Sequence, residues 1–76
     1  MLKTETNSPA MGKKVLTAAR KNFKHYQIED NRIFTVFEHG QWWVKFFDVT
    51  EETDRTFSVC DAEGVGTIGG FSFEEV

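Results

Sequence analysis

The sequence predicts an α+β domain in which one N-terminal amphipathic helix packs on a three- to four-stranded antiparallel β-meander. Apolar residues recur at helical spacing only between residues 9 and 27, whereas residues after 31 form short β-branched and aromatic runs separated by turn formers. Seventy-six residues lie near the lower size limit for a single core, and eight Phe, two Trp and one Tyr supply large buried areas. We therefore expect a disordered tail over 1–8 and a single small domain over 9–76.

The helix is expected to begin at Ser8-Pro9 and to run to about Gln27. Serine suits the N-cap and proline suits the first helical position, while Gly12 should weaken the first turn. Residues spaced for one apolar face of this helix are Met11, Val15, Ala18, Ala19, Phe23 and Tyr26. This face should cover the sheet.

Residues 31–48 read as two strands joined by a two-residue turn at His39-Gly40. This turn fixes a register that can be checked. It pairs Phe37 with Trp42, Thr35 with Val44 and Ile33 with Phe46 on one face, and Val36 with Trp43, Phe34 with Lys45 and Arg32 with Phe47 on the other. Both faces are largely apolar, although one helix can cover only one of them.

The second apolar face allows two interpretations. Phe34, Trp43, Lys45 and Phe47 could form an exposed surface that docks on a protein partner, joins two copies of the chain, or stacks nucleic-acid bases. Alternatively, the sheet could curl and bury this face together with Phe57, Phe71 and Phe73. The sequence leaves both open.

Residues 55–61 and 71–75 read as the later strands, with a glycine-rich connection between them. Its Gly64-x-Gly66-x-x-Gly69 spacing matches the dinucleotide-binding fingerprint. That fingerprint holds phosphates at the N-terminus of a following helix, but "FSFEEV" after Gly70 reads as a strand. We expect a loop, with no bound nucleotide or other cofactor.

The residues that could carry chemistry are sparse. His25, His39 and the single cysteine, Cys60, lack the spacing of a metal motif, and no serine or threonine lies in a nucleophile elbow. The carboxylates Glu51, Glu52 and Asp54 are expected in one turn and should be solvated. We predict a protein that is not an enzyme, holds no metal and takes no small-molecule substrate.

The net charge of −3 conceals a division between the two parts of the chain. Residues 1–27 carry six basic residues and one acidic residue, whereas residues 28–76 carry three basic and eleven acidic residues. The basic residues expected on the exposed helix face are Lys13, Lys14, Arg20, Lys21 and Lys24. Such a face could bind nucleic acid by releasing counterions, or could simply be solvated. If the carboxylates of 48–54 and 61–75 shared one face, they could instead imitate DNA and inhibit a basic protein.

The function that the sequence favours is a non-enzymatic interaction or regulatory module that binds a protein partner through its aromatic sheet face. Nucleic-acid binding and DNA mimicry are the alternatives. No apolar run approaches the roughly 20 residues of a membrane span, and the N-terminal residues lack the apolar stretch of a signal peptide. We therefore expect a cytoplasmic protein that does not bind membranes.

Overall fold

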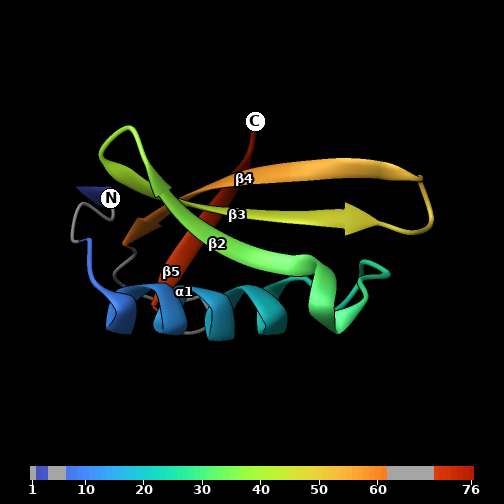
Figure 1. Cartoon of the computed structure of the whole chain (residues 1–76), viewed down its shortest axis with the longest axis horizontal. Helices are drawn as coiled ribbons and strands as arrows, with labels where there is room; N and C mark the ends of the chain where they lie inside the picture. The colour runs from blue at the N-terminus through green and yellow to red at the C-terminus, as the bar shows by residue number, and fades with distance from the viewer. Residues whose placement is uncertain (1, 4–6, 62–69) are drawn as a thin grey trace.

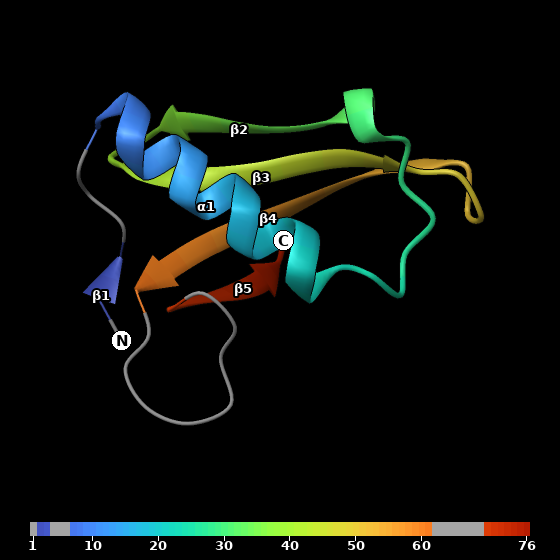
Figure 2. The same ribbon diagram turned by 90° about the horizontal axis from the view of Figure 1, so that it is seen from below.

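A computed structural model describes residues 2–3, 7–61 and 70–76 and has the predicted α+β architecture. A helix lies against one face of an antiparallel sheet, so the molecule has two layers (Figures 1 and 2). The elements in chain order are β1 (Leu2–Lys3), α1 (Pro9–Asn22), the short 3₁₀ helix η1 (Asp30–Arg32), β2 (Ile33–Glu38), β3 (Gln41–Asp48), β4 (Thr53–Asp61) and β5 (Phe71–Glu75).

The predicted start of the helix is confirmed, but its predicted end is wrong. Ser8 is the N-cap, and its Oγ accepts a hydrogen bond from the Met11 N–H at 3.1 Å. The helix ends at Asn22, about five residues before Gln27, with Phe23 as its C-cap. The Tyr26 N–H donates to the Phe23 carbonyl at 3.0 Å, so the chain tightens into a turn beyond the helix. This turn directs the Phe23 and Tyr26 rings into the core.

The predicted register of the β2–β3 hairpin is confirmed from Ile33–Phe46 to Phe37–Trp42. His39 and Gly40 have φ values of 54° and 76°, as a two-residue type I′ turn requires. Arg32 precedes the paired residues, but its guanidinium lies 5.3 Å from the centroid of the Phe47 ring, the residue predicted to face it.

Strands β2, β3, β4 and β5 form the predicted meander, each pairing antiparallel with the next. In addition, Leu2 and Lys3 pair with Asp61 and Cys60 of β4, so the predicted disordered tail contains a two-residue strand. The glycine-rich residues 62–69 lie outside the described residues. Gly70 has a φ of 80°, and strand β5, not a helix, follows it.

The core lies between α1 and the sheet. Its buried apolar residues are Val15, Ala18, Ala19, Phe23, Ile33, Trp42, Val44, Phe46, Phe57, Val59 and Phe71. The Phe23 ring packs on the rings of Phe46, Phe57 and Phe73, with centroids 5.4, 4.4 and 5.0 Å away. Because Phe57, Phe71 and Phe73 belong to this helix-side core, the interpretation in which they bury the opposite face is wrong.

Candidate functional site

The sheet face opposite α1 carries the residues that the sequence singled out as a docking surface. Strand residues alternate between faces, so the neighbours of the buried Val44 and Phe46 point away from the helix. We call this surface the outer sheet face and define it by Phe34, Val36, Trp43, Lys45, Phe47, Asp54, Thr56 and Ser58.

The four predicted contact residues, Phe34, Trp43, Lys45 and Phe47, all lie on the outer sheet face. Phe34 and Lys45 are directly opposite each other across the β2–β3 ladder. The Phe34 side chain is 53% exposed, which is unusual for a phenylalanine in a strand, and the other three are half-buried. The structure therefore brings these residues onto one surface.

Two polar contacts within the hairpin involve side chains of this surface. The Trp43 Nε1–H donates to the Glu38 carbonyl at 2.9 Å, which fixes the orientation of the indole. The Lys45 Nζ lies 3.6 Å from Glu38 Oε1. Because its indole is already oriented, Trp43 would lose little side-chain freedom when a partner binds.

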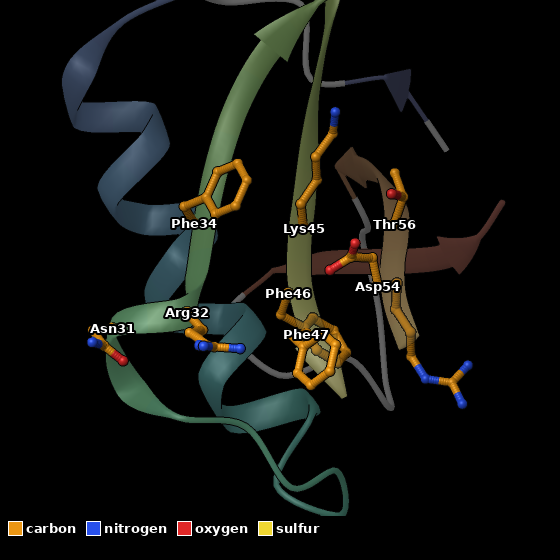
Figure 3. A pocket seen from close by; sticks show the side chains of 9 residues that line it. Asn31, Arg32, Phe34, Lys45, Phe46, Phe47, Asp54 and Thr56 are labelled. Carbon is orange, nitrogen blue, oxygen red and sulfur yellow. The ribbon is translucent and has the colours of Figure 1, made fainter. Parts of the chain in front are cut away.

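An open hollow of about 570 Å³ lies beside Phe34 on this face (Figure 3). Its lining combines apolar rings, cationic groups and two further residues of β4. The rings are those of Phe34, Phe46 and Phe47, the cationic groups belong to Arg32, Lys45 and Arg55, and the β4 residues are Asp54 and Thr56. Figure 3 shows the Phe34, Lys45 and Phe47 side chains projecting from β2 and β3 with α1 behind the sheet. The hollow thus combines an apolar floor with a mainly cationic border.

Trp43 lies between two smaller hollows. One, of about 290 Å³, extends toward Ser58, Cys60 and the end of β5. The other, of about 200 Å³, lies against the hairpin turn at Glu38 and His39. The surface is therefore uneven around its two aromatic centres, Phe34 and Trp43, and offers several recesses for side chains.

A charged cluster that the sequence analysis missed lies on the helix side of the sheet. The Arg55 Nε donates to Asp48 Oδ2 at 2.7 Å, and its Nη1 donates to Glu75 Oε2 at 2.7 Å. The hydrogen bond from Arg55 lowers the pKa of the Asp48 carboxyl, and the Glu51 and Thr50 N–H groups act in the same direction. The hydrogen bonds to Asp48 and, second, to Glu75 raise the pKa of Arg55.

This cluster explains the geometry of the chain around it. The Asp48 side chain accepts from the Thr50 and Glu51 N–H groups, so it closes the β3–β4 turn as an Asx turn. The Arg55 guanidinium also lies 5.0 Å from the centroid of the Tyr26 ring. Both carboxylate oxygens of Asp48 accept hydrogen bonds, and the residue is only 2% exposed, so the cluster has a structural role.

The basic residues predicted on the helix are all exposed: Lys13, Lys14, Arg20, Lys21 and Lys24. The placement of Lys24 on the helix is wrong, because α1 ends at Asn22. Lys13, Lys14 and Lys21 border a hollow of about 330 Å³ with Thr17. The α1 sequence contains no acidic residue, and no ion pair links these three lysines to a carboxylate in the part of the chain that is described. This surface therefore keeps its positive charge.

The carboxylates considered for DNA mimicry do not share one face among the described residues. Asp48 and Glu75 point to the helix side, where both bind Arg55, whereas Asp54 and Glu74 belong to the opposite side. The side chains of residues 61 and 63 lie outside what the structure describes. DNA mimicry therefore has the weakest geometric support of the three predicted functions.

His25 and His39 are exposed, and Cys60 is half-buried in β4. Residues 2–3, 7–61 and 70–76 contain no group of three histidine, cysteine or acidic side chains placed to hold a metal ion. Within the same residues, no helix is long and apolar enough to span a membrane. Comparison of the chain with protein-family models, with curated proteins and with solved structures gave no match.

Proposed function

We propose that this protein is a non-enzymatic interaction module, cytoplasmic in location, that docks on a protein partner through the outer sheet face. The observation that carries the proposal is the exposed Phe34 beside the hollow that Phe47 and Lys45 also line. Exposed aromatic residues bordered by oriented polar groups are typical of the centres of protein interfaces.

The lining of the hollow indicates the chemistry of the partner. Phe34 and Phe47 suit an apolar side chain, and the adjacent Arg32 and Lys45 favour a carboxylate close to it. The volume of about 570 Å³ accommodates one or two large side chains. We therefore expect the partner to present an aromatic or aliphatic residue next to an acidic one.

The test is affinity capture from the source cells with wild-type protein and with a Phe34→Ser variant. The half-exposed Phe34 contributes little to the core, so this variant should keep its circular dichroism spectrum and lose partner binding. Purified partner should then bind Phe34→Ser with a dissociation constant at least about tenfold higher than that of wild type.

The matched control is Lys21→Glu on the opposite side of the molecule, which should bind the partner as wild type does. Chemical shift changes on binding should map to amides of the outer sheet face in β2, β3 and β4. A partner that binds Phe34→Ser and wild type equally, or that shifts only α1 amides, would refute the proposal.

A second candidate function is nucleic-acid binding through the basic face of α1. It is favoured by the lysine-bordered hollow at Lys13, Lys14 and Lys21 and by the absence of acidic residues from the helix. Titration with single-stranded and duplex oligonucleotides at two salt concentrations tests it. A phosphate-binding surface requires the affinity to fall steeply as salt concentration rises. Lys14→Glu should make this dependence on salt less steep, whereas Lys45→Glu on the other face should leave it unchanged.

A further inference from the structure

Strand β2 forms one edge of the sheet. In the described part of the chain β2 pairs only with β3, and Figure 2 shows it as the outermost strand on the side away from β5. An edge strand presents unpaired N–H and C=O groups along its open side.

The hairpin geometry determines the outward groups. In a hairpin with a two-residue turn the flanking residues, Glu38 and Gln41, form a hydrogen-bonded pair, and such pairs alternate along the ladder. The backbone groups of Ile33, Thr35 and Phe37 therefore point to the open edge. No described residue forms a backbone hydrogen bond with them across that edge.

The edge lacks the features that normally prevent strand addition. Residues 33–37, "IFTVF", contain no charge, proline or glycine, and all five favour extended backbone. Charges stand only at the two ends of this segment, with Arg32 before it and Glu38 as its last strand residue. Opposite charges at the ends of a strand suit antiparallel pairing with an identical strand, because each end then meets its opposite.

We propose that two copies of this chain pair through antiparallel β2 strands, with the two-fold axis at Thr35. In this register Thr35 faces Thr35 of the second copy, and Ile33 faces Phe37, so outward groups meet outward groups. Phe34 then faces Val36 of the second copy on the outer sheet face. Among the registers that satisfy the backbone, this one places Arg32 opposite Glu38 at both ends of the interface.

Arg32 and Glu38 can leave their present ion pairs to pair with a second copy of the chain. Arg32 Nε lies 3.2 Å from Glu29 Oε2, and Glu38 is 3.6 Å from Lys45, in pairs whose side chains are more than a third exposed. Exposed pairs of this kind contribute little stability, so Arg32 and Glu38 can turn toward a second copy. The resulting sheet would be continuous across the two chains.

This inference goes beyond the proposed function, because the dimer forms through the backbone edge of β2, where Phe34 and Val36 are the outer-face side chains that meet, whereas partner docking uses the hollow between Phe34, Lys45 and Phe47. The two can also fail independently. A monomer can still bind a partner through Phe34 and Phe47, and a dimer can form without one.

The test uses two charge-reversal variants, Arg32→Glu and Glu38→Lys, and sedimentation equilibrium from micromolar to millimolar concentration. Wild type should be a dimer at the upper end of this range. Each variant alone opposes like charges at both ends of the interface, so its dimer dissociation constant should rise by roughly tenfold or more. An equimolar mixture of the two variants should form a heterodimer, because both opposed pairs are then attractive.

Hydrogen exchange identifies the edge itself. As the concentration of wild type rises, the amides of Ile33, Thr35 and Phe37 should gain protection, while those of Phe34 and Val36, already bonded to β3, should change little. Wild type that stays monomeric, variants that dimerise as wild type does, or a mixture that does not associate would each overturn the proposal. Protection of the same three amides only on addition of another protein would also overturn it.

Discussion

Gly12 of α1 lies directly against the indole of Trp42 in β3. A β-carbon built on Gly12 would stand 2.8 Å from Trp42 Cη2 and 3.1 Å from its Cζ3. Both residues are buried, so the absence of a side chain at position 12 sets how closely the helix approaches the sheet.

We expect Gly12→Ala to destabilise the protein. Alanine favours the helix over glycine by about 1 kcal/mol, but overpacking against a buried, rigid ring costs about 1–3 kcal/mol. The expected net loss in the free energy of unfolding, measured in urea, is about 1 kcal/mol. Thr17→Ala, on the exposed helix face, is the control and should not lose stability. In a Trp42→Phe background Gly12→Ala should cost less stability than it does in wild type, and an equal cost in both backgrounds would show that Trp42 is not the obstacle.

The Asp48–Arg55 pair predicts a loss of stability in acid. The folded-state pKa of Asp48 is lowered from its ordinary 3.8, chiefly by the Arg55 hydrogen bond. A lowered pKa means that the pair stabilises the fold fully above the unfolded-state value and loses this effect as pH falls through the folded-state value. The free energy of unfolding should therefore decrease as pH falls below about 5.

Asp48→Asn should lower stability at neutral pH and flatten its dependence on pH in the acid range. The control is Asp54→Asn, which removes a carboxylate from the exposed outer sheet face instead. Urea unfolding followed by circular dichroism at several pH values checks both variants. Equal pH profiles for Asp48→Asn and Asp54→Asn would contradict the assigned role of Asp48.

The two neighbouring tryptophans should differ in solvent access. Trp42 is 7% exposed in the core, whereas Trp43 lies on the outer sheet face and is half-buried. A Trp42→Phe variant, which retains Trp43, should therefore be quenched more strongly by acrylamide than a Trp43→Phe variant, which retains Trp42. Equal quenching in the folded variants would mean that the outer sheet face is covered in solution.

Glu52 has a φ of 53°, a conformation that glycine and asparagine tolerate better than glutamate does. Glu52→Asn should stabilise the protein by roughly 0.5–1 kcal/mol through relief of this strain. Glu51→Asn removes the same charge from the adjacent position, which does not have a positive φ, and should change stability little. Thermal unfolding of the two variants separates the backbone effect from the charge effect.

The hairpin shows what the sequence could predict. The two-residue turn at His39-Gly40 and the alternation of residues 33–46 depend on local geometry, so the register and the membership of the outer sheet face followed from them. The positions of Phe34, Trp43, Lys45 and Phe47 on one surface were predictable for the same reason.

Features that depend on packing between distant segments were not predictable. The helix ends at Asn22, and beyond it the Phe23 and Tyr26 rings pack on residues of β3, β4 and β5. Helical spacing cannot reveal these contacts. From the sequence, Gly12 is only a residue that weakens the helix. Its role in letting the helix approach the Trp42 ring becomes visible only in the fold. The Asp48 turn left a local signal, an aspartate before a polar turn, but its pairing with Arg55 required the fold.

The position of the Phe23 ring has a consequence for how the protein folds. This ring joins the end of the helix to β3, β4 and β5. The aromatic residues that it contacts lie between 3 and 50 residues after Phe23 in the sequence. No shorter stretch of sequence can assemble this aromatic cluster alone, so helix and sheet gain their stability together. The described fold should behave as one cooperative unit, in which opening of β5 or of the helix end exposes the same core.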